Sequence, residues 1–306
     1  MSTLLNASGV QGHLAVLVDS FESSPWQVLT SPFMVNAFIA GALIAFAACA
    51  VGYFVLLRDL PFATHSVAHI GFPGATLAVL LGASPVVGLI AGCVAGGLAI
   101  GAFGNRLGDR EIATGTILAF ASGLGILFTS VGTGQSGMVT NILFGNILAV
   151  TSEQLWLFMG IAIVVLAFLA ITGRKLMFAS VDPVVAQSRG LPVAWLSVGF
   201  LIAMSLVIAI SVTIVGVLLI FALLVTPAAT ASRFTTRPGF IVGIAGGIAL
   251  VSIWAGLVAS AFVPWPPSFI ITTIACAIWA LSFLKKADTR VIDDHKNDAA
   301  IHAREH

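Results

Sequence analysis

The chain is dominated by apolar runs that are too long and too weakly charged for a soluble fold. Between positions 33 and 284, long uncharged stretches alternate with short segments that carry arginine, lysine, proline or glycine. A helix needs about 20 mainly apolar residues to cross a bilayer. Only 8% of the residues are charged, against about 25% in soluble domains. The sequence therefore predicts an all-α, polytopic membrane protein.

Charges, prolines and glycine-rich turns divide the apolar part into eight or nine predicted crossings. The predicted spans are 33–57, 63–82, 86–103, 115–131, 155–172, two between 194 and 231 with a possible break at 211–213, 240–263 and 269–284. With nine crossings, all basic clusters share one side, which predicts a cytoplasmic face there and an external N-terminus. These clusters are Arg58, Arg106 with Arg110, Arg174 with Lys175, Arg233 with Arg237, and Lys285 with Lys286. If the segment 138–150 is not a simple crossing, the N-terminus moves inside.

The two ends of the chain differ from the membrane part. Residues 1–32 lack a basic start and a long apolar core, so we expect a retained leader that lies partly in the interface. Residues 285–306 are polar and charged, which predicts a cytoplasmic tail. The net charge of +1 does not suggest a nucleic-acid partner. No Walker-type phosphate loop is present, so the chain is not expected to bind ATP in that way.

Small residues are frequent within the apolar runs. Glycines three or four apart in 91–104 and 243–250 predict close helix packing. Cys49, Cys93 and Cys276 are far apart in apolar runs, and we interpret them as small core residues.

Two histidines stand near the start of the second predicted span. His65 and His69 are four residues apart, so on a helix they lie about 40° apart on one face. Such a pair can bind a metal ion or relay protons. The alternative is that His65 lies near the interface and His69 is a packed polar residue. A metalloprotease is not expected, because Ser66 stands where that motif has its glutamate.

Helix-disturbing residues follow this pair at once. Gly71, Pro73 and Gly74 come two to five residues after His69. We expect them to loosen the helix and free backbone carbonyls beside an internal path.

A second informative segment is the polar stretch 182–192. Asp182 and Pro183 are typical of a helix start, while Gly190 and Pro192 are typical of its end. A short helix on the basic side can dock on a soluble partner or can be a simple connector.

These two segments resemble the membrane subunit of bacterial ABC importers for zinc and manganese. The segment 64–74 is similar to that family's Gly-Asp-x-x-x-His-x-x-x-x-Gly, with His69 at the family histidine. Residues 182–192 match Asp-x-x-x-Ala-x-x-x-Gly-hydrophobic-Pro, and 215–231 match Val-Gly-x-Leu-Leu followed by Thr-Pro-Ala-Ala-Thr-Ala. A Leu-Phe-Gly element at 143–145 adds to the resemblance, which covers about residues 34 to 284.

The resemblance implies a permease of the type II-like metal importer fold in a bacterial cytoplasmic membrane. It implies two copies of this chain around one path, two cytoplasmic ATP-binding subunits and an extracytoplasmic metal-binding protein. The chain itself would be no enzyme and would hold no permanent cofactor. The resemblance implies that His69 and the residue at the partner position, His65, relay the metal. It assigns ATPase coupling to Asp182, Pro183, Ala186, Gly190, Leu191 and Pro192.

The chain departs from the family pattern at the first position of the relay. His65 stands where the family has aspartate, and Thr64 stands where it has glycine. Imidazole suits zinc, iron, copper and nickel, whereas manganese prefers oxygen ligands. We therefore expect zinc as the transported metal. Manganese or iron in the same class, or a stand-alone proton-coupled metal carrier, remain the alternatives.

Overall fold

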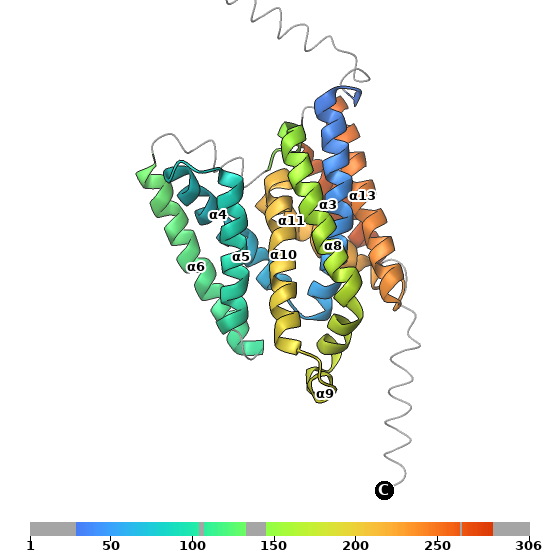
Figure 1. The fold of residues 1–306 in the computed structure, drawn as a ribbon. Coiled ribbons are helices and arrows are strands. Elements are labelled where there is room, and N and C mark those ends of the chain that lie inside the picture. The colour runs from blue at the N-terminus through green and yellow to red at the C-terminus, as the bar shows by residue number, and fades with distance from the viewer. Residues whose placement is uncertain (1–28, 104–106, 133–144, 264, 284–306) are drawn as a thin grey trace, which may run out of the picture.

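The computed structural model describes residues 29–103, 107–132, 145–263 and 265–283, and every regular element in these ranges is a helix (Figure 1). The α-helices are α3 (Pro32–Leu57), α4 (Pro61–Leu80), α5 (Pro85–Phe103), α6 (Leu107–Val131), α8 (Ser152–Val181), α9 (Pro183–Ser188), α10 (Val193–Val215), α11 (Val217–Leu224), α12 (Thr226–Ala231), α13 (Pro238–Phe262) and α14 (Pro267–Ser282), and η1 (Ile147–Ala149) is a short 3-10 helix. The predicted all-α membrane fold is confirmed. The predicted leader and tail lie almost wholly outside these residues.

Six helices are long and apolar enough to cross a bilayer: α3, α5, α8, α10, α13 and the Glu111–Val131 part of α6. Shorter apolar helices cover Leu219–Ala231 and Pro267–Ser282. Helix α4 has 20 residues, which is about 30 Å of helix and enough for a crossing. Its histidines make it less apolar than its neighbours.

Several contacts place basic residues at one end of the bundle. Arg58, directly after α3, donates hydrogen bonds to Ser180 at the end of α8 and to Ser197 near the start of α10. Arg233, after α12, lies over the ring of Phe283, which follows α14. Figure 1 shows the end of α8, all of α9 and the start of α10 together at this end. This common end agrees with the prediction that the basic clusters share one side of the membrane; that this side is cytoplasmic stays a prediction.

Exposed tryptophans mark both ends of the bundle. Trp156 begins α8 and Trp265 lies between α13 and α14, whereas Trp195 begins α10 and Trp279 is near the end of α14. All four side chains are exposed. Tryptophans gather at the two membrane interfaces, so these residues support a membrane-spanning arrangement.

Helix α4 is continuous, so the expectation that its glycines and proline loosen it is wrong, although Pro73 still leaves the His69 carbonyl without its helical donor. The helix runs through Pro73 from Pro61 to Leu80. Gly74 lies against Gly88 and Gly92 of α5, where a Cβ on Gly92 would come 3.1 Å from the Gly74 Cα. The glycines therefore permit close packing of two helix backbones, which is the role predicted for the small residues of 91–104.

The expected break between the sixth and seventh spans lies later than predicted. Helix α10 continues through Ser211 and Thr213. The Thr213 hydroxyl donates a hydrogen bond to the Ala209 carbonyl within this helix. The chain breaks at Gly216, with φ 87° and ψ 164°, a region that is essentially restricted to glycine. The backbone of Gly145 packs against this break.

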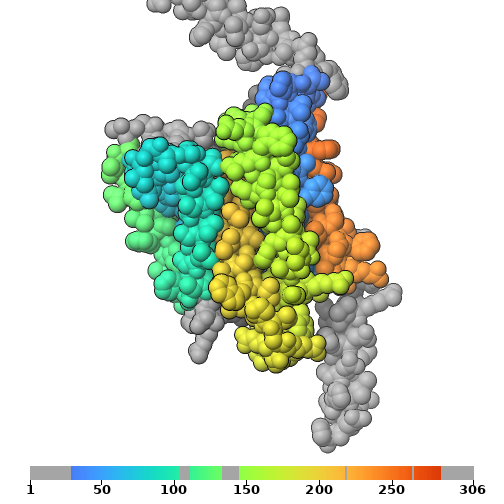
Figure 2. All heavy atoms as spheres, in the orientation of Figure 1, coloured from blue at the N-terminus to red at the C-terminus, as the bar shows by residue number. Residues whose placement is uncertain are grey.

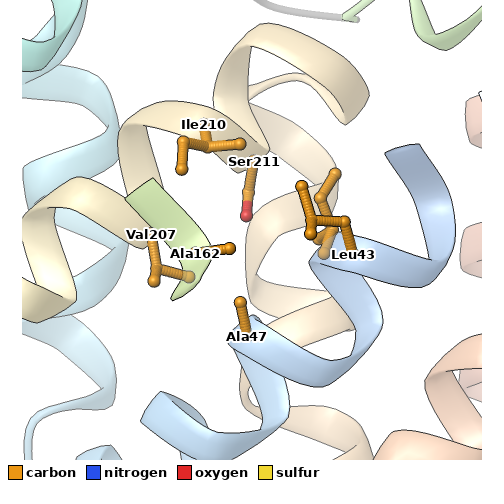
Figure 3. Close-up of a pocket in the computed structure, with 7 residues that line it drawn as sticks. Leu43, Ala47, Ala162, Val207, Ile210 and Ser211 are labelled. Atoms are coloured by element: carbon orange, nitrogen blue, oxygen red, sulfur yellow. The ribbon is translucent and has the colours of Figure 1, made fainter. Parts of the chain in front are cut away.

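The bundle interior between α3, α8 and α10 is closed. A gap there is lined by Leu43, Ile44, Ala47, Ala162, Val207, Ile210 and Ser211 (Figure 3). It has no room for a water molecule, and its lining is apolar apart from the hydroxyl of Ser211. A hydrated metal ion therefore has no path through this part of a single chain.

The three cysteines are unpaired. Cys49 and Cys93 are buried, as predicted for core residues, but Cys276 is exposed. The prediction was wrong for Cys276, whose apolar run belongs to a peripheral helix.

Candidate functional site

The two membrane histidines lie next to each other on one face of α4. The ring centroids of His65 and His69 are 4.7 Å apart, with the rings inclined at 70°. Both side chains are half-buried. The edge of Phe221, from α11, completes the cluster with its centroid 6.4 Å from that of His65. The prediction that the pair shares a face is confirmed.

The opposite face of α4 packs on the rest of the chain. Gly71 and Gly74 contact α5, and the Cys93 thiol lies 3.6 Å from the Val67 carbonyl. These positions are roughly 140–240° around the helix from the histidines. The histidines are thus directed away from α5, beside Phe62, which is 48% exposed.

The histidine face offers only part of a metal site. Among the residues that the structure describes, no group of three His, Cys, Asp or Glu side chains could hold a metal ion. Asp59, the nearest acidic residue in the sequence, lies in the turn before α4 at a φ of 56° and is exposed. Two imidazoles alone leave a tetrahedral metal half coordinated, so further ligands must come from elsewhere.

Helix α4 also leaves one backbone carbonyl without its helical donor. Pro73 lies inside α4 and has no N–H, so the carbonyl of His69 lacks its usual donor four residues later. A carbonyl released in this way can serve as a hard oxygen ligand. His69 therefore offers nitrogen and oxygen from one residue.

The predicted coupling segment forms a short capped helix at the end of the bundle (Figure 1, Figure 2). Asp182 caps α9 by accepting a hydrogen bond from the Val185 N–H at 2.9 Å, and Pro183 occupies the first turn. Gly190 ends the helix at a φ of 77°, where the Leu191 N–H donates to the Ala186 carbonyl at 3.1 Å.

One side of α9 is buried against the bundle, and the other side is exposed. Ala186 is fully buried, and the guanidinium of Arg189 lies 5.5 Å from the centre of the Phe178 ring on α8. Val184 is 75% exposed. The structure thus brings together all the residues predicted for coupling, with Pro192 capping the start of α10. It shows a helix of six residues with an unpartnered apolar surface.

The sequence did not reveal two features of the structure, the contact of Phe221 with His65 and the break at Gly216. Phe221 lies in a uniformly apolar run, and nothing in the sequence distinguishes it from its neighbours. Gly216 could have been found, because a glycine between two valines interrupts an otherwise unbroken apolar segment.

Known proteins share this sequence pattern and fold. The manganese transport system membrane protein MntC of Halalkalibacterium halodurans is 31% identical over 258 residues, covering 84% of this chain and 88% of that protein. The manganese import system permease protein ScaB of Streptococcus gordonii is 34% identical over 200 residues, covering 65% and 72%.

A solved structure of PsaBC from Streptococcus pneumoniae in complex with Fab has a TM-score of 0.77 and 26% identity, and the match covers 92% of this chain and 99% of that one. An inward-facing structure of a putative metal-chelate type ABC transporter has a TM-score of 0.66 at 18% identity, which supports the fold alone. The model of the ABC 3 transport family matches residues 30–286. Because that match covers nearly the whole described bundle, the chain belongs to the ABC 3 transport family and is a multi-pass ABC permease, not the ATPase.

Proposed function

We propose that this chain is the permease subunit of an ATP-driven importer of a divalent transition metal. The observation that carries the proposal is the His65–His69 pair, whose rings are 4.7 Å apart on the face of α4 that is turned away from α5. Neutral imidazoles bind divalent transition metals. An ionisable pair on a membrane helix is a costly feature that is typical of a substrate path.

A second copy of the chain would complete the site. The gap inside one chain has no room for water and is mainly apolar, whereas the histidine face and the flanking Phe62 remain partly uncovered. Two such faces in contact would bring together up to four imidazole nitrogens, a coordination number that suits transition metals. A path between two copies also explains why the described residues of one chain contain no complete metal site.

Manganese is the first candidate for the transported metal. The relatives MntC and ScaB are named for manganese, and the carbonyl of His69 offers the oxygen that manganese prefers. The zinc expectation is not supported by these relatives. Zinc remains the second candidate for one specific reason, the imidazole of His65 at a position where the family resemblance leads us to expect a carboxylate.

The partners follow from the family and from α9. The exposed side of α9, with Val184, would dock on an ATP-binding subunit, and movement of α9 would be transmitted to the bundle. A metal-binding protein on the opposite side of the membrane would deliver the ion. The chain itself would bind and release the metal without chemical conversion.

Uptake by the reconstituted transporter tests the proposal. The chain and its ATP-binding subunit are placed in vesicles, and uptake of radioactive manganese and zinc is measured with and without ATP. We expect ATP-dependent uptake that falls at least tenfold in His65→Ala and in His69→Ala. Phe120→Ala, which shortens an exposed side chain of α6, should transport normally.

Each part of the proposal can fail separately. Unchanged uptake in both histidine variants would show that the pair is not on the metal path. Uptake without ATP would instead support a stand-alone carrier. A preference for zinc that changes to manganese in His65→Asp would show that His65 selects the metal.

A further inference from the structure

One aromatic side chain reaches the histidine pair from another part of the chain. Phe221 lies on α11, and the centroid of its ring is 6.4 Å from that of His65, with the two ring planes 88° apart. His69 contacts the same imidazole from α4 itself, at 4.7 Å and 70°. Edge-to-face geometry of this kind is favoured between aromatic rings. The His65 ring therefore has one aromatic neighbour on its own helix and another on α11.

Within the described part of the chain, the two imidazoles have ring contacts but no hydrogen bonds. A histidine that binds a metal normally donates its second ring N–H to a carboxylate, a carbonyl or water, and this bond fixes the direction of the ring. Here the direction of the His65 ring depends on packing instead. Phe221 supplies a packing contact that comes from outside α4.

Helix α11 holds Phe221 in place at this contact. Ile220, Leu223 and Leu224 on the same helix are all buried, and the Phe221 carbonyl accepts a hydrogen bond from the Val225 N–H at 3.0 Å. The Phe221 side chain itself is 41% exposed, because its ring is directed out of this core. The backbone is thus anchored, while the ring lies beside the half-buried imidazole.

We propose that Phe221 is a positioning residue that aims the His65 imidazole at the transported metal. This inference rests on the proposed function, because it takes the histidine pair as the metal site. Phe221 does not bind the ion; it restricts the rotation of the imidazole, so less conformational freedom is lost when the metal binds. An aromatic pair of this kind shifts an equilibrium by about two- to tenfold, and its loss should weaken metal affinity by a similar factor.

Uptake of radioactive manganese and zinc by the chain reconstituted with its ATP-binding subunit measures this role. Phe221→Leu and Phe221→Met keep an apolar side chain but remove the ring, so the test does not depend on the folding of one variant. Both should raise the KM for metal about two- to tenfold and change the maximal ATP-dependent rate less than about twofold. Phe221→Tyr keeps the ring and should restore the wild-type KM. Phe240→Leu, which removes an exposed ring of α13, is the matched control and should change neither value.

The effect of Phe221 should disappear when position 65 has no imidazole. In a His65→Asp background, Phe221→Leu should leave the KM unchanged, because a double-mutant cycle isolates the contact between the two side chains. An equal rise of the KM in the wild-type and His65→Asp backgrounds would overturn the positioning role. An unchanged KM in both ringless variants, or a Phe221→Tyr variant as weak as they are, would overturn it as well. The proposed function fails on a different result, namely unchanged uptake in His65→Ala and His69→Ala.

Discussion

The cap of α9 gives the sharpest prediction about coupling. Helix α9 has only six residues, and a helix so short is not stable in isolation. It is held by the Asp182 cap, by burial of Ala186 and by the stacking of Arg189 on Phe178. Asp182→Ala removes the first of these contacts and leaves the other two. We therefore expect α9 to remain present but to fray more often.

The size of this effect follows from the cap itself. Replacing a good N-cap residue with alanine costs about 0.5–2 kcal/mol, typically about 1 kcal/mol. Because about 1.4 kcal/mol is a factor of ten, the balance between ordered and frayed α9 should shift roughly fivefold. A frayed α9 would transmit ATPase movement less efficiently to α10, which begins directly after Pro192.

The assay is the number of metal ions imported per ATP hydrolysed by the reconstituted complex. Asp182→Ala should lower this ratio several-fold, while the histidine pair is unchanged. Asp182→Asn should retain it, because asparagine is an equally good cap. Gln187→Ala, at an exposed position of the same helix, should have little effect. If Asp182→Asn is as harmful as Asp182→Ala, the carboxylate charge matters and the capping argument is refuted.

Three further predictions concern packing and exposure. Gly74→Leu should destabilise the protein by about 1–3 kcal/mol through overpacking against Gly88. The control Gly247→Leu faces open space in α13 and should leave the melting temperature unchanged. Equal melting temperatures of the two variants would contradict the close packing of α4 on α5. Gly216→Ala should cost about 1–3 kcal/mol, because its φ of 87° disfavours a side chain, and denaturation in detergent would measure it. Cys276 should react with a membrane-permeant maleimide, whereas the two buried cysteines should not. Peptide mass spectrometry would measure the labelling, and labelling of all three cysteines would contradict the burial of Cys49 and Cys93.

Local patterns in the sequence were enough to predict much of both sites. Helical periodicity alone places His65 and His69 on one face. The segment from Asp182 to Pro192 contains a cap, a first-turn proline and a terminating glycine within eleven residues, so its short helix could be predicted without tertiary contacts. The family resemblance added the role of each segment.

Features that depend on distant contacts could not be predicted in this way. Pro73 and its glycines suggested a disrupted helix, but close contact with the glycines of α5 keeps α4 continuous. The break at Gly216 packs against the backbone of Gly145, which lies 71 residues earlier in the chain. The exposure of Cys276 depends on which face of α14 its neighbours cover. Apolar runs predict membrane helices, but they do not specify which faces meet.

Helix α10 connects the two sites that the proposed function requires. It has 23 residues, or about 34 Å of helix, and it extends from Pro192 beside α9 to the break at Gly216. Beyond the break, α11 presents Phe221 to His65. A displacement of α9 along α10 would therefore reach the histidines through a change of direction at Gly216. If this route carries the coupling, Gly216→Ala should lower the metal imported per ATP more than it lowers metal binding, whereas a purely structural role would reduce both together.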